Sequence, residues 1–353
     1  MALDELIDVL SGARHGVWPA TLRAMLTAAE VPYSGIMRVR NGLYDLKILR
    51  ARRLPRPTIS IGNLTTGGTG KTPLVCWLAT ELRARGRRPA VLMRGYHSNG
   101  RQSDEAKLIA QFIPAESVIA NPNRIAGAAS ALEKQPQTDL FLLDDSMQHR
   151  RAGRDVEIVL ISAVEPWGYG HVLPRGLLRE PISGLARADA IVLTHISEVS
   201  PFKLLAIKGT VRQYNGEAPI FSADHMLTGL LSAGGEELPL TTLADRKYFI
   251  ACAIAQPVSF LQGLKRYGEG CVGHQIFPDH YAFEESDVAE LRKAAKEAGA
   301  TAIIVTEKDW TKLGEMPSVR ESDIPFWRTR LSMAFAGEGS RKLLELVLRK
   351  TAN

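Results

Sequence analysis

The sequence contains little cysteine and no long apolar run. Its three cysteines among 353 residues lie far apart and form no CxxC pair, which argues against a disulfide framework or a zinc site and favours a reducing compartment. No stretch approaches the roughly 18 consecutive apolar residues that a membrane-spanning helix needs. The first residues, MALDELIDVLSGARHG, carry three acids and lack the basic and apolar regions of a signal peptide. We therefore expect a cytoplasmic protein.

Apolar residues make up 45% of the chain and charged residues 23%, and no segment has the composition of a disordered region. After Pro57, short apolar runs alternate with glycine turns and helical patterns, which is typical of a parallel sheet covered on both faces. Strands of this sheet are predicted at residues 58–62, 89–93, 139–143, 157–162 and 188–194, with a helix at 71–85.

The pattern changes near residue 205, where Gly- and Pro-bearing turns join shorter apolar runs. Short strands are predicted at 207–214, 220–222 and 227–231. A second α/β unit follows, with an apolar run at 247–254, helices at 258–267 and 284–298, and a strand at 302–306. The tail after residue 340 has a helical pattern.

The net charge of +6 is unevenly distributed, because the segment from Arg38 to Arg56 holds seven basic residues against one acid. Just upstream, residues 18–37 are rich in apolar side chains at helical spacing. An apolar helix face followed by a cationic cluster is what a helix lying on an anionic membrane surface needs. The alternative is an ordinary amphipathic helix packed on the core, followed by a solvated basic linker.

The segment NLTTGGTGKT follows the first predicted strand and precedes a helix. Its glycines let backbone N–H groups approach phosphate oxygens. Lys71 brings a positive charge to the β- and γ-phosphates, and the Thr72 hydroxyl can bind Mg²⁺. The strict pattern has glycine where this chain has Thr65, so the loop is a variant. We predict that it binds Mg-ATP through residues Thr65, Thr66, Gly67, Gly68, Thr69, Gly70, Lys71 and Thr72.

Two acids, Asp144 and Asp145, directly follow the predicted strand 139–143. A nucleotide enzyme with a parallel sheet places the carboxylate that holds Mg²⁺ at such a strand end. Two acids after a strand would otherwise indicate a turn. Together with the upstream loop, they predict a magnesium site.

The residue before the glycines of the loop separates two classes of protein. A class of ATPases that dimerise on membranes or DNA has the loop KGGTGKT, with an extra lysine, and Thr66 occupies that position here. The missing lysine argues against such an ATPase and favours a phosphotransferase.

A wider set of motifs, in order over about residues 57–313, carries a resemblance to a known family. These motifs are GNLTTGGTGKTP (62–73), RGY (94–96), DE (104–105), Arg124, DDSMQHR (144–150), LPRGLLREP (173–181), RADA (187–190), FPDHY (277–281) and TEKD (306–309). The chain resembles the tetraacyldisaccharide 4′-kinase family. The resemblance implies ATP- and Mg²⁺-dependent phosphorylation of the 4′-hydroxyl of a tetraacylated glucosamine disaccharide 1-phosphate, forming lipid IVA in lipid A biosynthesis.

The same resemblance implies roles for individual residues. Asp104 and His280 would form a dyad that accepts the proton of the sugar hydroxyl. Arg124 would act with Lys71 to stabilise charge on the transferring phosphoryl group. Without the family, Asp104 is a candidate helix cap and His280 an ordinary loop histidine. Further candidates for the same cleft are Glu105, Gln148, His149, Arg179, Glu180 and Asp279.

We therefore predict an α/β fold in which a P-loop NTPase-type, mostly parallel sheet flanked by helices is joined to a second, smaller α/β domain. The predicted parts are an amphipathic and basic membrane-contact segment (1–57), the P-loop kinase domain (58–210), the smaller α/β domain (211–335) and a C-terminal helix packing back on the first domain (336–353). The cleft would lie between the two lobes, with Asp104 and Arg124 in the first and His280 in the second.

The expected partners are the glycolipid substrate and the cytoplasmic face of the inner membrane, with no nucleic acid and no obligate protein partner. The family makes membrane contact by the N-terminal helix the favoured interpretation, because a multiply acylated acceptor does not readily leave the bilayer. Departures from the family pattern at Met93, His97, Ala106 and Ser146 leave acceptor choice open. The alternatives are a related kinase for another glycolipid or a small sugar, and a non-catalytic ATPase switch on a membrane.

Overall fold

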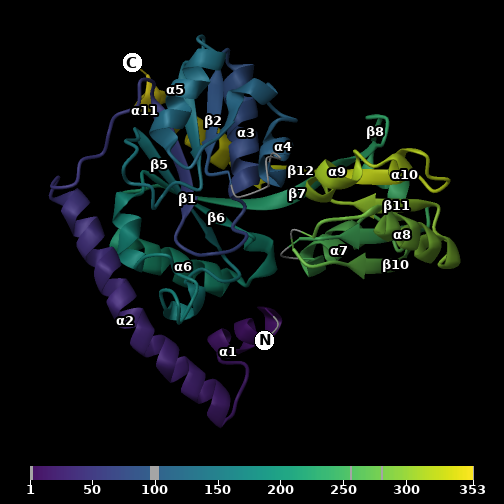
Figure 1. Cartoon of the computed structure of the whole chain (residues 1–353), viewed down its shortest axis with the longest axis horizontal. Helices are drawn as coiled ribbons and strands as arrows, with labels where there is room; N and C mark the ends of the chain where they lie inside the picture. Colours follow the sequence, from purple (N-terminus) through teal and green to yellow (C-terminus); the bar gives the residue numbers. More distant parts are fainter. Residues whose placement is uncertain (1–2, 96–102, 255–256, 280, 353) are drawn as a thin grey trace. The chain divides into compact units, whose positions relative to one another are not determined.

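The computed structural model describes residues 3–95, 103–254, 257–279 and 281–352 (Figure 1). Contacts divide the chain into two compact units. Unit 1 comprises Met1–Gly95, Glu116–Asp224 and Phe335–Asn353, and unit 2 comprises Tyr96–Ala115 and His225–Ala334.

Unit 1 is built on a parallel sheet with the strand order β7-β6-β5-β1-β4-β2-β3. The five strands β1, β2, β4, β5 and β6 are buried at every position, as expected for strands covered on both faces. The strands are β1 (Thr58–Asn63), β2 (Pro89–Met93), β3 (Val118–Ala120), β4 (Leu140–Asp144), β5 (Val156–Ser162), β6 (Ala190–Thr194) and β7 (Ile220–Ser232), the last of which continues into unit 2.

Helices of unit 1 pack on this sheet: α3 against β1 and β4, α5 against β2 and β3, and α11 against β5. Asn123 caps α5 by accepting from the backbone N–H groups of Ile125 and Ala126. The helices are α1 (Leu3–Ser11), α2 (Val17–Asp45), α3 (Lys71–Ala84), α5 (Arg124–Lys134), α6 (Pro201–Tyr214) and α11 (Gly339–Thr351), with 3₁₀ turns at Ala115–Ser117, Gly168–Gly170, Ile182–Arg187 and Ile196–Glu198.

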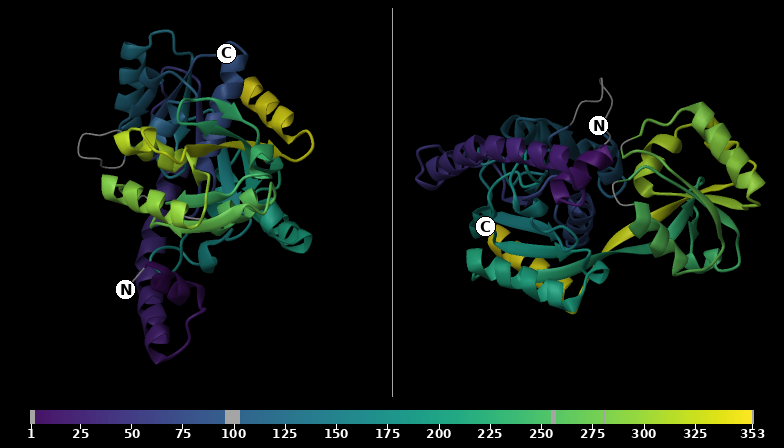
Figure 2. Two further views of the ribbon diagram at one scale, coloured as in Figure 1. Left: turned by 90° about the vertical axis from the view of Figure 1, so that its right-hand side faces the viewer. Right: turned by 90° about the horizontal axis from the view of Figure 1, so that it is seen from below.

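The 29-residue helix α2 is much longer than the other helices of unit 1. Its N-terminal half, with α1 folded against it, projects beyond the sheet of unit 1 in Figure 1 and in the left-hand view of Figure 2. Within the described residues, no helix is both long enough and apolar enough to span a bilayer.

Unit 2 has its own sheet, with the order β10-β9-β11-β12-β7 and the short β8 antiparallel to β7. Its core includes Phe249, Val288, Leu291 and Phe326. The strands are β8 (Glu237–Leu238), β9 (Tyr248–Cys252), β10 (Cys271–Ile276), β11 (Ala302–Val305) and β12 (Phe326–Phe335); the helices are α4 (Asp104–Ile109), α7 (Pro257–Lys265), α8 (Glu285–Glu297), α9 (Glu307–Leu313) and α10 (Pro317–Arg320), with a 3₁₀ turn at Leu240–Leu243.

The prediction of a P-loop NTPase-type α/β fold with a mostly parallel sheet is confirmed. The strand predicted at 207–214 is wrong, because these residues belong to α6. The Ser200 side chain accepts from the Lys203 N–H and Pro201 occupies the first helical position, two start signals that fix a helix. The segments 220–222 and 227–231 are parts of the single strand β7.

The boundary between the two units differs from the one predicted from the sequence. The boundary lies between Asp224 and His225, within β7, whereas the predicted boundary at residue 210 lies within α6. Asp104, assigned from the sequence to the first domain, belongs to unit 2, since α4 packs on α9 some 200 residues later in the chain. Helix α11 belongs to unit 1.

Candidate functional site

The phosphate loop occupies the turn between β1 and α3, as the sequence predicts. Gly67 and Gly70 have φ of 112° and 84°, values that side chains with a Cβ rarely adopt. Gly70 precedes the first residue of α3, so the free N–H groups of that helix end face the loop. The loop is held from outside by Thr194, whose hydroxyl donates to the Thr69 carbonyl at 3.0 Å.

The LPRGLLREP segment lies alongside the beginning of this loop. The Thr66 N–H donates to the Leu177 carbonyl at 2.7 Å, and the Arg179 N–H donates to the Leu64 carbonyl at 2.7 Å. An antiparallel bridge joins Thr65 to Leu178 between these two bonds. The motif therefore acts as a short backbone brace for the phosphate loop, a role that its sequence alone did not indicate.

A charged cluster forms where β1 and β4 end. The Arg179 guanidinium contacts both carboxylate oxygens of Asp145, at 2.8 and 2.9 Å. The Lys71 ammonium lies 3.5 Å from the same carboxylate and donates to the Asn63 side chain at 3.1 Å. The structure thus brings together three predicted site residues, and adds Asn63, which the sequence analysis missed although it lies two residues before the loop.

Electrostatics keep the Asp145 carboxylate charged. Burial would by itself raise the pKa of Asp145, but the positive charges of Lys71 and Arg179, and their hydrogen bonds, outweigh burial and hold that pKa below its ordinary value. Asp145 also has φ of 48°, a left-handed conformation that aspartate tolerates better than most residues. This turn directs the carboxylate toward the phosphate loop.

Asp144 is the last residue of β4 and is buried. Its backbone carbonyl accepts hydrogen bonds from Arg124 at 2.9 Å and from the Ser146 hydroxyl at 3.0 Å. Arg124, only 2% exposed, also donates to the Asn121 carbonyl at 2.9 Å. The guanidinium predicted to act on phosphate therefore fastens the start of α5 to the strand end that bears both acids.

A buried carboxylate, Glu180, organises the far side of the cluster. It is 0% exposed and accepts from the Gln148 side chain at 3.0 Å and from Arg187 at 2.7 and 2.8 Å. Gln148 also donates to the Asn63 carbonyl at 2.9 Å. Gln148 and Glu180 are thus paired with one another, beside the residues that hold Lys71 and Asp145.

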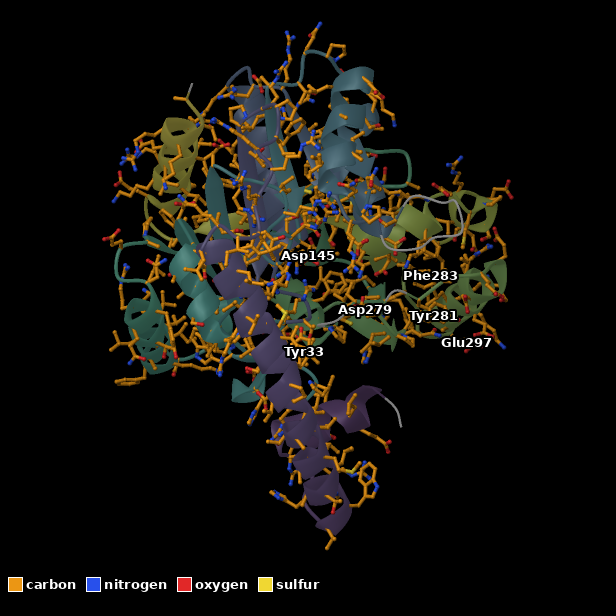
Figure 3. The ribbon with its side chains drawn as sticks, turned by 60° about the vertical axis from the view of Figure 1, so that its left-hand side comes forward. Tyr33, Asp145, Asp279, Tyr281, Phe283 and Glu297 are labelled. Carbon is orange, nitrogen blue, oxygen red and sulfur yellow. The ribbon has the colours of Figure 1, made fainter. Side chains whose placement is uncertain are left out.

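Helix α2 contacts the same network. The Asn41 amide donates to Glu180 at 2.7 Å, the Tyr33 hydroxyl donates to the Arg179 carbonyl at 2.8 Å, and Arg40 donates to the Gln148 carbonyl at 2.8 Å. Figure 3 labels Tyr33 on the α2 ribbon and Asp145 at the phosphate loop. One face of the N-terminal helix is therefore part of the structure around the phosphate loop, a connection that sequence spacing did not reveal.

His149 is half-buried next to the acids, and its Nε2 atom has no hydrogen-bond partner among the described residues. Burial, with the positive charge of neighbouring arginines, lowers the pKa of His149 from 6.5 to about 4. The imidazole is therefore neutral at physiological pH. The arginines are Arg124, Arg154, Arg40 and Arg151.

This depressed pKa predicts a pH-dependent stability. The unfolded chain binds a proton at His149 below about pH 6.5, whereas the folded chain resists it down to about pH 4. The free energy of unfolding should therefore fall as the pH is lowered through this window. Urea unfolding across the window should show a shallower fall in His149→Gln than in the wild type, with the exposed His15→Gln as control. An equally steep fall in His149→Gln would contradict the prediction.

The donors in unit 1 suit Mg²⁺ rather than a metal enclosed by protein. Among the described residues, no group of three or more His, Cys, Asp or Glu side chains is arranged to hold a metal ion. Mg²⁺ is typically bound by one or two carboxylates together with phosphate oxygens and water. Asp144 and Asp145 end a strand paired with β1, and the Thr72 hydroxyl begins α3 beside Lys71, so hard oxygen donors are available on both sides of the loop.

The remaining predicted residues belong to unit 2. Asp104 and Glu105 form the first turn of α4, which Ser103 caps by accepting from the Ala106 N–H, so Asp104 is not the cap. The Asp104 carboxylate contacts Lys312 at 2.7 Å, and Asp279 contacts Lys308 at 2.8 Å. His280 lies outside the described residues. Lys312 was not among the residues singled out from the sequence.

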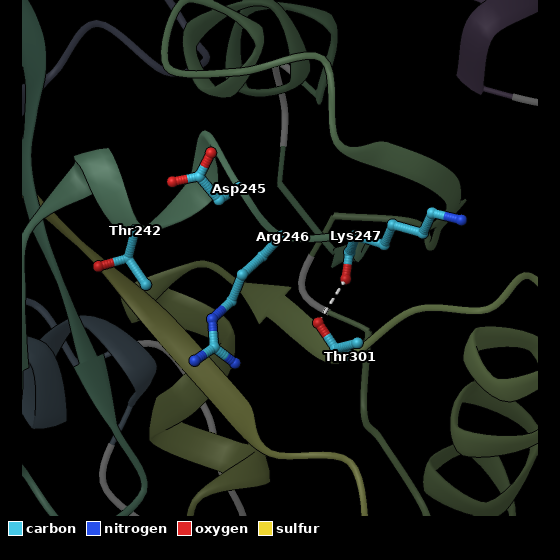
Figure 4. Close-up of a pocket in the computed structure, with 5 residues that line it drawn as sticks. All are labelled: Thr242, Asp245, Arg246, Lys247 and Thr301. Atoms are coloured by element: carbon cyan, nitrogen blue, oxygen red, sulfur yellow. Dashed lines mark hydrogen bonds between the residues drawn. The ribbon is translucent and has the colours of Figure 1, made fainter.

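Unit 2 also has a hollow just before the start of β9, lined by Thr242, Asp245, Arg246, Lys247 and Thr301 (Figure 4). Its Thr301 hydroxyl donates to the Lys247 carbonyl at 3.0 Å. None of these residues belongs to a motif described above, so the hollow is not part of the candidate site.

A strand, a glycine turn, a lysine at a helix start and an acid paired with that lysine together define a P-loop nucleotide-binding protein. The profile of the Tetraacyldisaccharide-1-P 4′-kinase family matches residues 22–351. The chain belongs to this family, and the resemblance inferred from its motifs is confirmed.

Individual relatives agree with the family. The chain is 36% identical over 322 residues to a tetraacyldisaccharide 4′-kinase of Pelobacter propionicus, covering 86% of each sequence. It is 38% identical over 314 residues to one of Geobacter metallireducens, covering 84% of this chain and 90% of that protein. Among solved structures, LpxK from Aquifex aeolicus in complex with ATP is similar, with a TM-score of 0.74 and 30% identity over 94% of this chain and all of that one.

Proposed function

We propose that this protein transfers the γ-phosphoryl group of ATP to the 4′-hydroxyl of a tetraacylated disaccharide 1-phosphate in lipid A biosynthesis. The observation that carries the proposal is the Lys71–Asp145–Arg179 cluster at the phosphate loop, in a chain whose family is named for that reaction. Phosphoryl transfer needs positive charge beside the phosphates and a carboxylate for the metal ion, and this cluster supplies both.

Each site residue of unit 1 has a role in this proposal. The loop Thr65–Thr72 binds the triphosphate through backbone N–H groups, and Lys71 moves from Asn63 and Asp145 onto the β- and γ-phosphates. Asp144, Asp145 and Thr72 hold Mg²⁺, which neutralises phosphate charge when bound. Arg124 keeps the strand end bearing the acids in place, and its charge would stabilise the transferring phosphoryl group. Arg179 orients Asp145, and the Glu180–Gln148 pair supports it from behind.

The acceptor side of the reaction is assigned to unit 2. A sugar hydroxyl is a weak nucleophile until its proton is accepted, and a carboxylate within hydrogen-bond reach can accept it. We assign this step to Asp104 acting with His280, with Glu105 and Asp279 supporting the same segments. The Lys312 ammonium contacts the Asp104 carboxylate at 2.7 Å and restricts where that carboxylate can lie.

Transfer of labelled γ-phosphate from ATP tests the proposal directly. The purified protein is incubated with the tetraacyl disaccharide 1-phosphate in mixed micelles and, separately, with a soluble amino sugar. Label is expected in the lipid at the 4′ position and not in the sugar. Label in the soluble sugar would instead indicate a related small-sugar kinase. ATP hydrolysis without a labelled acceptor would indicate an ATPase switch.

We further propose that α2 holds the enzyme on the cytoplasmic face of the inner membrane. The helix has two distinct faces. One donates to the phosphate-loop network through Tyr33, Arg40 and Asn41. The other exposes apolar side chains at helical spacing, with Met25, Val31, Ile36 and Val39 exposed by 64–68%, and Arg38 is exposed beside them.

An apolar stripe flanked by an arginine, on a helix that projects from its domain, suits insertion at a lipid interface. Basic side chains follow it along the chain: Lys47, Arg50, Arg52, Arg53 and Arg56 are all exposed. Anionic lipid headgroups attract such a cluster by about 1 kcal/mol for each cation near the surface. The sequence analysis counted Arg40 in this basic cluster, but its side chain points into the protein and donates to the Gln148 carbonyl.

Replacing Ile36 and Val39 together by serine should weaken vesicle binding by about 100-fold or more, because an aliphatic side chain contributes about 1.5–3 kcal/mol when it is fully removed from water. Co-sedimentation with vesicles of phosphatidylethanolamine and phosphatidylglycerol measures the effect. Phe202→Ser and Leu205→Ser on α6 are a matched control, since both side chains are at least as exposed but lie on another helix. Equal binding by the Ile36/Val39 variant and the wild type would contradict membrane contact by this face.

A further inference from the structure

The TEKD motif, residues 306–309, has no role in the chemistry described so far, yet its helix is firmly anchored. Thr306 caps α9 by accepting from the Asp309 N–H at 3.0 Å. Asp309 is 0% exposed, and its carboxylate accepts from the Thr306 hydroxyl at 2.6 Å and from the Ala253 N–H at 3.1 Å. The start of α9 is therefore fixed to the chain just beyond β9.

One turn further along this helix, Lys312 joins two other segments. Its ammonium contacts the Asp104 carboxylate at 2.7 Å and donates to the Tyr281 carbonyl at 2.9 Å. The lysine side chain is 17% exposed and the Asp104 side chain 20%. A single charged group thus ties the start of α4 and the backbone of the FPDHY segment to the same helix.

The Tyr281 carbonyl is itself a well-fixed partner. The Tyr281 ring packs against Phe277 and Phe283, with ring centroids 4.8 and 5.3 Å away, and its hydroxyl donates to Asp287 at 3.2 Å. Figure 3 labels Asp279, Tyr281 and Phe283 in this part of unit 2. Because the carbonyl cannot move freely, the hydrogen bond to it restricts where the Lys312 ammonium can lie.

We propose that Lys312 is a positioning residue for phosphoryl transfer, which holds the Asp104 carboxylate in one place relative to the backbone at Tyr281. The inference rests on the proposed role of Asp104 as proton acceptor. An ammonium that is also hydrogen-bonded to the Tyr281 carbonyl offers the carboxylate one location, whereas a solvated carboxylate samples several rotamers.

A second lysine, Lys107, also links α4 to α9, but its ion pair is exposed to solvent. It does so through the Thr311 carbonyl at 3.3 Å and Glu315 at 2.8 Å. The Glu315 side chain is 69% exposed, and exposed pairs of this kind contribute little to stability. Lys107 therefore serves as a matched control: it bridges the same two helices and makes its ion pair with Glu315.

The test compares Lys312→Met, Lys312→Gln and Lys312→Arg with Lys107→Met in the lipid phosphorylation assay. We expect Lys312→Met to lower kcat roughly 30- to 100-fold, because misplacing a reacting group by about 1 Å can cost 10²-fold. The KM for ATP should stay unchanged, since the phosphate loop belongs to unit 1. Lys312→Arg should recover a large part of the rate because it keeps the charge. Lys312→Gln, which removes the charge, should resemble Lys312→Met. The rate of the control Lys107→Met should stay within threefold of the wild type.

A double-variant comparison separates positioning from a general effect on the fold. If Lys312 acts through Asp104, adding Lys312→Met to Asp104→Asn should lower the residual rate no further. Multiplying effects in the double variant, or a loss no larger than that of Lys107→Met, would overturn the inference. Full activity of Asp104→Asn alone would instead refute the proposed role of Asp104. If Lys312→Met keeps the wild-type rate while Asp104→Asn loses activity, the inference about Lys312 fails and the proposed function stands.

Discussion

Lys71→Met is expected to lower kcat for lipid phosphorylation by about a thousandfold, the range seen when a charge that stabilises a transition state is removed. Methionine keeps the length of the side chain and removes its charge. The variant should fold normally, because Asp145 retains both contacts to Arg179, and the polar contacts of the Lys71 side chain with described residues are those to Asn63 and Asp145. Steady-state rates at saturating ATP measure the effect, with thermal unfolding as the check on folding.

The control for this variant is Lys134→Met in the last turn of α5, an exposed lysine of the same unit. It should leave kcat and the affinity for ATP unchanged. Calorimetric titration of Lys71→Met with ATP should also show weaker binding, since the lysine contacts the phosphates of the ground state as well. A kcat for Lys71→Met within a few-fold of the wild type would mean that another cation serves the γ-phosphate.

The phosphate loop could be located from the sequence because its determinants are local. The glycines, the lysine and the apolar strand before them lie within about fifteen residues, and β1 and α3 begin where their patterns predict. Asp144 and Asp145 were found for the same reason, since a buried strand leads directly into them. Local signals of this kind do not depend on how the rest of the chain packs.

The partners of those residues could not be predicted, because they come from distant parts of the chain. Arg179 reaches Asp145 across 34 residues, and the Thr66 N–H finds the Leu177 carbonyl 111 residues away. The LPRGLLREP motif could be recognised by its letters, but its function as a backbone brace depends on this long-range pairing. Asn41 and Tyr33 were missed for the same reason.

In unit 2, too, sequence order failed to predict which distant residues pack together. Sequence order places Asp104 with the phosphate loop, but the packing of α4 on α9 places it with residues 200 positions later. The apolar run of α6 fits a strand and a helix equally well by composition, and only the Ser200–Pro201 cap decides between them. The α2 segment was correctly expected to contain an apolar helix face, but its second, docked face became visible only through contacts with Arg179 and Glu180.

Asp104→Asn should lower kcat by roughly 10²- to 10⁴-fold, the usual contribution of general acid–base catalysis. Asparagine has nearly the same shape and can still accept a hydrogen bond from Lys312, so α4 should stay docked on α9. It cannot accept the proton of the acceptor hydroxyl. The lipid phosphorylation assay measures the loss, and Asp323→Asn, which alters an exposed acid of unit 2 paired with Arg292, is the control.

The two large effects should differ in a way that identifies each residue's step. Lys71→Met acts on the triphosphate, so it should weaken ATP binding and slow transfer to any acceptor. Asp104→Asn acts only on the acceptor proton, so its affinity for ATP should equal that of the wild type while transfer to the lipid is lost. If Asp104→Asn instead weakened ATP binding as much as Lys71→Met, the carboxylate would belong to nucleotide binding, and proton acceptance would have to be assigned to another group.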